Sequence, residues 1–267
     1  MDVVMLIAVG LLTGVTTVLF GFGGGFVAVP VVVWADAALG ADAMRVATAT
    51  SALVMVVNAG FATAVTPRRV LLALRGSGRL LLLLAAGASA GALATRLAPA
   101  DPARWAFVAY VALTIADLLL RPGFLRPPTR AGGTSDTPRP LPAVLGAPIG
   151  AIAAFLGVGG SVMTVPTMRR AGHTMHVATA LANPLTLAIA LPATAVSLGV
   201  AAVPAATDAP VHLVGLIDLR AASALLLGAL PVIAVLRRRP LRLPDRTYAW
   251  AYIGLLAAVA VAMLLSA

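Results

Sequence analysis

Two glycine-rich segments contain the residues whose types and spacing could bind a ligand. The first reads G-F-G-G-G-F-V-A-V-P from Gly21 to Pro30, and the second reads G-V-G-G-S-V-M-T-V-P from Gly157 to Pro166. Glycine clusters allow sharp turns of the backbone and leave N–H groups uncovered. If each cluster begins a helix, the free N–H groups and the positive end of the helix dipole form an anion site without lysine or arginine. We therefore expect both segments to bind an anion.

Hydroxyl and amide side chains after each segment could complete this site. The sequence V-A-T-A occurs after both segments, at 46–49 and at 177–180, and Asn183 directly precedes a proline. The alternative role for such side chains is a hydrogen bond to their own helix; Asn58 is a weaker counterpart of Asn183. The predicted substrate-binding residues are Gly23, Gly24, Gly25, Thr48, Ser51, Gly159, Gly160, Ser161, Thr179 and Asn183. Gly21, Pro30, Gly157, Pro166 and Pro184 are expected to shape the backbone around them.

Other chemistries find little support in the sequence. Ser161 would be the nucleophile of an intramembrane hydrolase, but no apolar segment supplies the His or Lys base that such an enzyme requires. The chain has no cysteine and no G-x-x-x-x-G-K-[ST] loop, so thiol chemistry and direct ATP hydrolysis are excluded. We expect no enzyme activity, no metal and no cofactor. An anion channel with the same helix N-termini remains an alternative to a carrier.

Composition places these segments in a membrane protein. The 267 residues are 61% hydrophobic and 10% charged, with a mean hydropathy of +1.02, which excludes a soluble globular domain. The net charge of +10 does not indicate nucleic-acid binding, because the arginines lie in short loops between apolar segments. The predicted fold is an all-α polytopic membrane protein, with the lipid bilayer as its surroundings.

Each half of the chain shows the same order of segments. A glycine-tipped helical hairpin of the re-entrant type comes first, and three transmembrane helices follow. The expected apolar segments are Val3–Phe20, 25–34, 45–65, 80–95 and 105–120 in the first half, and 141–156, 157–168, 174–200, 221–236 and 248–266 in the second. We therefore predict a first repeat at residues 1–120, a linker at 121–140 and a second repeat at 141–267.

Arginine placement predicts the orientation of the two repeats. The loops around Arg68, Arg121, Arg169 and Arg238 are the basic ones, and basic loops stay in the cytoplasm. All four face the cytoplasm only if each hairpin enters and leaves on one side, which makes the second repeat inverted. Both termini are then outside and the linker is cytoplasmic. Inverted repeats with interrupted helices are typical of secondary transporters, which bind substrate between the repeats.

The duplicated G-x-G-G-[GS]-x-x-x-V-P motif, each copy followed by V-A-T-A, resembles the TauE/SafE family over essentially the whole chain. This resemblance implies a bacterial inner-membrane transporter of a small anion, with the glycine motifs in its core. We expect the protein to export sulfite or an organosulfonate, bound between the two glycine segments near the membrane midplane. The remaining expected partners are a coupling ion, proton or sodium, and a second copy in a homodimer.

Charged and aromatic residues near span ends receive simpler interpretations. Asp117 lies four residues before Arg121, which favours a surface ion pair over proton transfer. His173 and His176 are expected in a solvated loop. Trp34, Trp105, Tyr248 and Trp250 are expected to anchor the protein at the membrane surface.

Overall fold

The computed structural model describes residues 2–98, 100–121, 123–125, 141–199, 213–238 and 243–265. The first half contains α1 (Val3–Phe20), α2 (Gly25–Ala35), η1 (Ala37–Asp42), α3 (Ala43–Ala64), α4 (Arg68–Leu71), η2 (Leu72–Leu74), α5 (Gly78–Leu97) and α6 (Ala100–Leu120). The second half contains η3 (Ala143–Leu145), α7 (Gly146–Leu156), α8 (Ser161–Arg170), α9 (Met175–Leu198), β1 (Leu213–Val214), β2 (Ile217–Asp218), α10 (Leu219–Arg238) and α11 (Asp245–Leu265). Most of the predicted linker 121–140 lies outside the described residues.

Length and hydropathy separate two kinds of helix. Seven helices of the described residues are long and apolar enough to cross a membrane: α1, α3, α5, α6, α9, α10 and α11. By contrast, α2 has 11 residues and α8 has 10, which is about half of what a bilayer requires. The chain is therefore an all-α polytopic membrane protein, as predicted.

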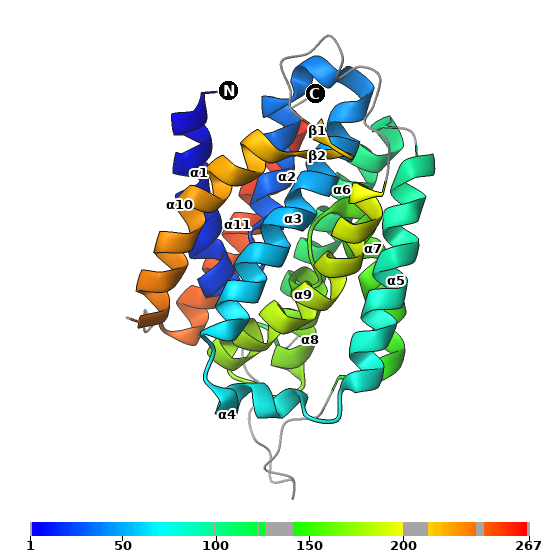
Figure 1. The fold of residues 1–267 in the computed structure, drawn as a ribbon. Helices are drawn as coiled ribbons and strands as arrows, with labels where there is room; N and C mark the ends of the chain where they lie inside the picture. Colours follow the sequence, from blue (N-terminus) through cyan, green and yellow to red (C-terminus); the bar gives the residue numbers. More distant parts are fainter. Residues whose placement is uncertain are drawn as a thin grey trace, which may run out of the picture.

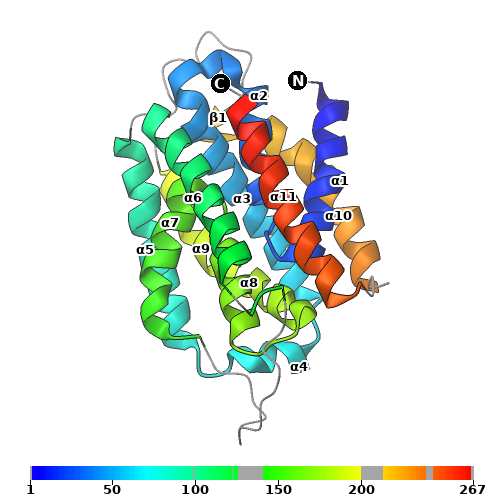
Figure 2. The same ribbon diagram turned by 180° about the vertical axis from the view of Figure 1, so that it is seen from behind.

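The two termini mark one end of the helix bundle. The start of α1, η1, the two short strands and the end of α11 lie together at this end, which we call the terminal end (Figure 1). The helix α4 lies at the opposite end, which we call the α4 end (Figures 1 and 2). α2 leads from the first glycine segment to the terminal end, whereas α8 leads from the second segment toward the α4 end.

The glycine segments turn the chain through the left-handed region. Gly21 and Gly157 end α1 and α7 with φ of 72° and 70°, and their N–H groups donate to the carbonyls of Thr17 and Ala153. Gly23 and Gly159 follow with φ of 63° and 70°. Residues with a Cβ rarely adopt these angles, so the repeated glycines specify the same turn twice.

Small residues set the closest helix contacts. A Cβ on Gly87 or Gly91 of α5 would collide with the carbonyl of Ala147 or Ala151 on α7. A Cβ on Gly14 of α1 would lie 2.6 Å from the carbonyl oxygen of Ala229 on α10. Gly87 and Gly91 therefore allow α5 and α7 to pack closely. These contacts join α5 to α7 and α1 to α10, across the two halves of the chain.

Some features differ from the sequence-based expectations. The basic loop after α3 contains the short helices α4 and η2, and the connection before α10 contains the antiparallel strands β1 and β2. Tyr248, expected at the membrane surface, is only 4% exposed because its ring packs edge-on against Phe20 at 5.7 Å. The three tryptophans are exposed, between 45% and 63%. Hydropathy placed Tyr248 at a span end correctly but could not indicate which way its ring points.

Candidate functional site

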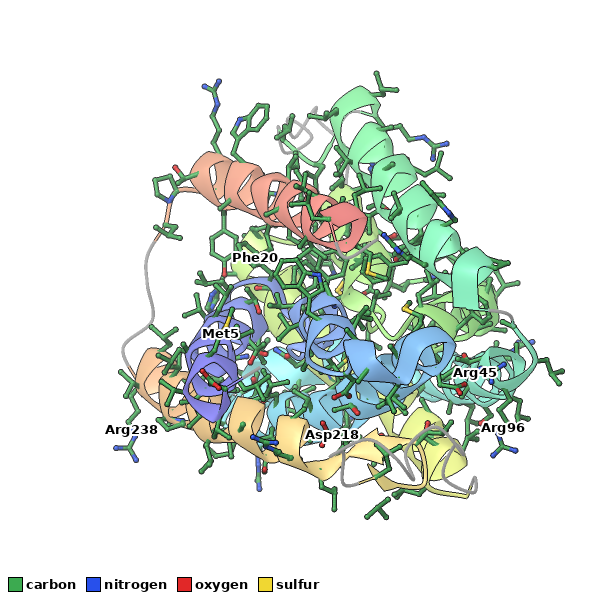
Figure 3. The ribbon with its side chains drawn as sticks, turned by 90° about the horizontal axis from the view of Figure 1, so that it is seen from above. Met5, Phe20, Arg45, Arg96, Asp218 and Arg238 are labelled. Atoms are coloured by element: carbon green, nitrogen blue, oxygen red, sulfur yellow. The ribbon has the colours of Figure 1, made fainter. Side chains whose placement is uncertain are left out.

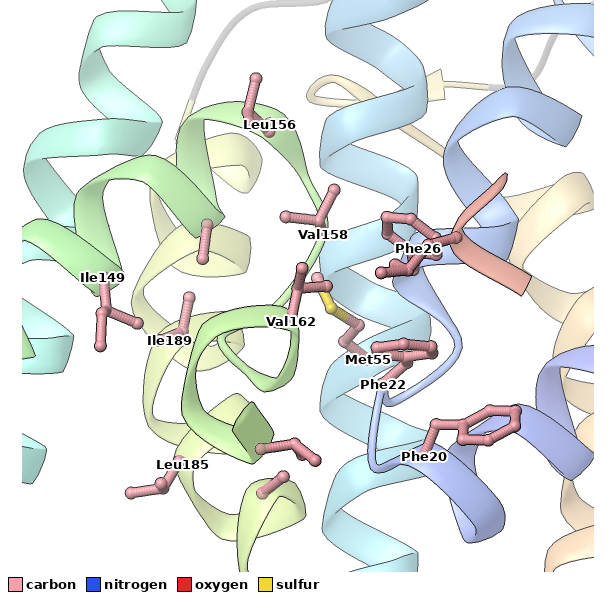
Figure 4. Close-up of a cluster of buried hydrophobic side chains, with 14 of the residues drawn as sticks. Phe20, Phe22, Phe26, Met55, Ile149, Leu156, Val158, Val162, Leu185 and Ile189 are labelled. Atoms are coloured by element: carbon pink, nitrogen blue, oxygen red, sulfur yellow. The ribbon is translucent and has the colours of Figure 1, made fainter. Parts of the chain in front are cut away.

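The two glycine segments meet in the core of the bundle. A Cβ on Gly23 would lie 3.0 Å from the Thr186 methyl group and 3.3 Å from Met55, and one on Gly159 would contact the same two side chains. The Gly159 position is also 3.4 Å from the carbonyl oxygen of Phe22. Figure 4 shows the loop with Phe22 facing the loop with Val158, with Met55 beside them. We call Gly21–Gly25 the first tip and Gly157–Ser161 the second tip.

Each tip also packs against a central helix from the other half. Gly21 lies against the carbonyl of Thr179 on α9, where a Cβ would be 2.5 Å from the oxygen. Gly157 lies against Thr48 and Ser51 on α3, at 3.0 and 2.9 Å from the position of its absent Cβ. Thr48 and Thr179 hold the same place in the repeated V-A-T-A sequence. The cross-contacts are therefore alike in the two halves.

Backbone N–H groups at both tips are buried and unused. Within the described residues, those of Gly23, Gly24 and Gly25 donate to no hydrogen-bond acceptor, and neither do those of Gly159, Gly160 and Ser161. Buried N–H groups nearly always have a partner in native proteins. These groups belong to the N-terminal ends of α2 and α8, where the helix dipole is positive. The arrangement can bind an anion through the backbone alone.

The predicted hydroxyl donors mostly bond to carbonyl groups. The Ser51 hydroxyl lies 2.8 Å from the Thr48 carbonyl and 2.9 Å from the Gly157 carbonyl. Thr179 donates to the carbonyl of His176 at 3.1 Å, in its own helix. Thr186, which the sequence did not single out, donates to the Gly21 carbonyl at 3.4 Å. Ser51 and Thr186 thus each hold the first carbonyl of one tip, which helps to orient the N–H groups that follow.

Several buried polar atoms around the tips have no partner among the described residues. Thr48 Oγ1 and Asn183 Oδ1 are in this state, although Asn183 Nδ2 donates to the Thr179 carbonyl at 3.4 Å. Ser161 Oγ and Thr164 Oγ1, at the start of α8, are also unpartnered. An unsatisfied buried polar atom has a high desolvation cost, so such atoms in one region indicate a ligand site.

The first tip has the most polar surroundings. Asn58 on α3 is fully buried, and neither its amide nitrogen nor its oxygen has a partner. Its Nδ2 would lie 2.8 Å from a Cβ on Gly24, whose φ is 85°, and Thr13 of α1 lies on the other side at 3.1 Å. Asn58 was expected only as a minor counterpart of Asn183, and Thr13 was missed. Sequence alone could have marked Thr13 only as a hydroxyl in an otherwise apolar helix.

The second tip differs from the first in its neighbours. Gly160 has φ of −79°, and a Cβ there would meet Ile189 and Ile149 at 2.5 and 3.5 Å. The hydroxyl of Tyr252 on α11 lies 3.2 Å from the Ser161 carbonyl and 3.4 Å from the Val162 carbonyl. Pro166 has no N–H to offer the Val162 carbonyl four residues earlier. Tyr252 therefore satisfies a group that the proline leaves free.

A small pocket lies between α3, α5 and α9, on the side of the terminal end. Its lining includes Arg45, Thr48, Thr95, Arg96 and Ser197. Figure 3 shows Arg45 and Arg96 close together at the terminal end. Arg45 pairs with Asp42 at 3.1 Å and Arg96 donates to the Val196 carbonyl at 2.9 Å, so both side chains are held beside this pocket.

The charged residues at the α4 end form ion pairs. Asp117 pairs with Arg121 at 3.0 Å, as predicted, and with Arg170 at 2.7 Å. Arg169, expected in a solvated loop, is 2% exposed and pairs with Asp245 at 2.7 Å. His176 is exposed, whereas partial burial lowers the pKa of His173. These groups hold α8 to its neighbours and lie outside the tip region.

Comparison with known proteins gives the family. The family model described as sulfite exporter TauE/SafE matches residues 6–263 of the 267. Searches of the curated proteins and of the solved structures found no match. The proteins of this family are membrane transporters and not enzymes. With its membrane-spanning helices and its match over nearly the whole chain, the protein belongs to the TauE/SafE sulfite exporter family.

Proposed function

We propose that the protein is a secondary transporter that exports a small oxyanion, sulfite or a short organosulfonate, bound between the two tips. The observation that supports this most is the meeting of two sets of buried, unused N–H groups beside Met55 and Thr186. Asn58, Asn183 and Thr48 would complete the site with amide and hydroxyl groups. The hydroxyls of Ser51 and Thr179 serve mainly to fix the backbone around it.

Electrostatics favours a singly charged anion at this place. Each helix N-terminus contributes about half a positive charge, so α2 and α8 together nearly neutralise one negative charge. A buried arginine would do the same at a cost of several kcal/mol in the membrane. Arg45 and Arg96 instead line a pocket at the terminal end, where their positive charge would favour the approach of anions.

We further propose that the halves are inverted repeats that move against each other. Three observations support this: the matching left-handed turns at the first and third positions of each tip, the exchange of contacts between each tip and the other central helix, and the opposite directions of α2 and α8. The arginine-rich loops place the α4 end in the cytoplasm and both termini outside. Because the tips are buried, a carrier with alternating access suits the site better than an open channel.

Exchange transport by the purified protein in liposomes tests this function. Liposomes loaded with unlabelled sulfite should accumulate labelled sulfite from outside even with the membrane potential clamped at zero, because a carrier couples efflux to influx while a channel does not. Methanesulfonate and sulfate are the competing anions, with methanesulfonate expected to compete better because it carries one negative charge and sulfate carries two. Rapid loss of label without any effect of internal sulfite would indicate a channel, and no movement of any of the three anions would contradict the proposal.

A further inference from the structure

Two carboxyl groups that the transport site does not use lie together at the terminal end. Asp36 directly follows α2 and is 3% exposed, and Asp218 directly precedes α10 and is 4% exposed. α2 packs against α10, and the Asp218 side chain is a near neighbour of the Asp36 carboxyl group. Asp36 Oδ2 is buried and has no hydrogen-bond donor in the described part of the chain. A buried carboxylate facing another without a donor between them is unstable unless one is protonated.

Local structure decides which carboxyl group stays charged. Asp218 Oδ1 accepts hydrogen bonds from the N–H groups of Arg220 at 2.8 Å and Ala221 at 3.1 Å. These bonds, and the positive end of α10, stabilise the ionised form of Asp218. Asp36 lies at the negative end of α2, which disfavours its ionised form. The proton therefore belongs on Asp36, with Asp218 accepting a hydrogen bond from it.

The surrounding charged groups do not change which of the two carboxyl groups holds the proton. Burial, and next the neighbouring charge of Asp218, raise the pKa of Asp36 to about 7, while the amino terminus acts weakly in the opposite direction. The charged side chains on adjacent elements are held elsewhere or exposed: Asp2 and Arg220 are exposed, Arg45 pairs with Asp42, and Arg104 donates to the carbonyls at the end of α11.

We propose that Asp36 and Asp218 form a proton-binding site that controls the first tip from the terminal end. The short helix α2 connects the two places, with Gly25 at its first residue and Asp36 immediately after its last. Its 11 residues span about 16 Å, so a single short helix links the two places. A proton on Asp36 bonds the end of α2 to the start of α10. Loss of this proton leaves two like charges in contact, and their repulsion displaces α2 together with the tip.

The expected pH dependence of transport rests on the proposed transport function, whereas the binding of a proton by Asp36 and Asp218 does not. A group with a pKa near 7 is about nine-tenths protonated at pH 6 and one-tenth at pH 8. Transport should therefore change several-fold over this interval of external pH at constant internal pH. Asp36→Asn, which keeps the size and resembles the protonated form, should transport at one rate throughout. Asp117→Asn, an equal change in an ion-paired carboxylate at the α4 end, should keep the pH dependence of the unmodified protein.

Infrared titration of the full-length protein in nanodiscs measures the proton directly. A protonated-carboxyl band should titrate near pH 7, disappear in Asp36→Asn and remain in Asp117→Asn. A titrating band without anion movement would support the proton site and contradict the transport function. Transport with no such band, or the same pH profile in Asp36→Asn, would overturn the proton site. A midpoint that falls steadily with added sodium would also overturn it, because it would show that the pair binds a metal cation.

Discussion

Gly23 and Gly159 come from opposite halves of the chain and lie against the same two side chains, Met55 and Thr186. Met55 belongs to α3 and Thr186 to α9, so each central helix contacts both tips. Any relative movement of the two halves must therefore change the spacing between the two sets of N–H groups. This geometry makes the tips suitable for alternately binding and releasing an anion.

Gly24→Val should abolish anion binding, whereas Gly160→Val should reduce it less. Gly24 has φ of 85° and its missing Cβ would meet Asn58 at 2.8 Å, so valine brings both backbone strain and a collision. Gly160 has an ordinary φ, and its nearest contact is the flexible end of Ile189. Gly76→Val is the matched control, because Gly76 has φ of 87° but no atom within 4 Å of its Cβ position.

Binding of labelled sulfite to purified, monodisperse protein measures these effects. The Gly76 variant separates general strain from damage to the tip. Anion binding at unchanged affinity in a folded Gly24→Val protein would show that the first tip serves packing alone.

Asn58→Ala and Asn183→Ala should each weaken anion binding. Each removes a buried amide whose hydrogen-bonding capacity the described chain leaves partly or wholly unused. A hydrogen bond to a charged group contributes about 1.5 to 3 kcal/mol, which corresponds to roughly ten- to a hundredfold in affinity. Ser89→Ala is the control, since Ser89 bonds the carbonyl of Ala85 in its own helix, away from the tips. Equal affinities for Asn58→Ala and Ser89→Ala would remove Asn58 from the site.

Tyr252→Phe should lower the thermal stability of the protein, because it removes a hydrogen bond at the second tip. The substitution keeps the ring, which packs 5.1 Å from Phe22, but leaves the buried Val162 carbonyl without its hydroxyl donor. The expected loss is about 1 to 3 kcal/mol. With Pro166→Ala in place, the backbone can supply an N–H to the same carbonyl, so the effect of Tyr252→Phe should shrink. Melting midpoints of the unmodified protein, the two single variants and the double variant measure the coupling between Tyr252 and Pro166. Additive effects of the two substitutions would contradict this coupling.

Hydropathy and glycine spacing predicted the helices well because these signals are local. The expected first segment, Val3–Phe20, matches α1 at both ends, and the tips begin α2 and α8 as expected. Contacts between residues that are far apart in the sequence could not be predicted in this way. Nothing local to Asn58 indicates that it faces Gly24, and nothing near Asp36 indicates that it meets Asp218. The tip glycines were accessible to sequence reasoning, while the side chains around them required the fold.

Cysteine labelling tests the proposed orientation, with positions revised by the structure. Arg169 was a predicted cytoplasmic marker, but its burial and its pairing with Asp245 would keep a cysteine there from reacting. Arg68, His176 and Arg238 are exposed and should react only from the cytoplasm, whereas Ala38 should react from outside. The connection that contains Asp208, which the same arginine argument places outside the cell, lies outside the described residues. Labelling of position 176 by an impermeant reagent in intact cells would contradict the inverted arrangement.

Protein stability should fall as the pH rises from acid toward neutrality, and Asp36 should be the cause. Its pKa is raised in the folded protein from 3.8 to about 7, chiefly by burial and then by the charge of Asp218. Between these values the folded state holds a proton that the unfolded state releases, so rising pH favours unfolding until Asp36 ionises. Melting midpoints in detergent should therefore decline from about pH 4 to pH 7 and level off above that. Asp36→Asn should flatten this decline and melt higher than the unmodified protein at pH 8, while a midpoint equally pH-dependent in both would show that Asp36 is ionised in the folded protein throughout.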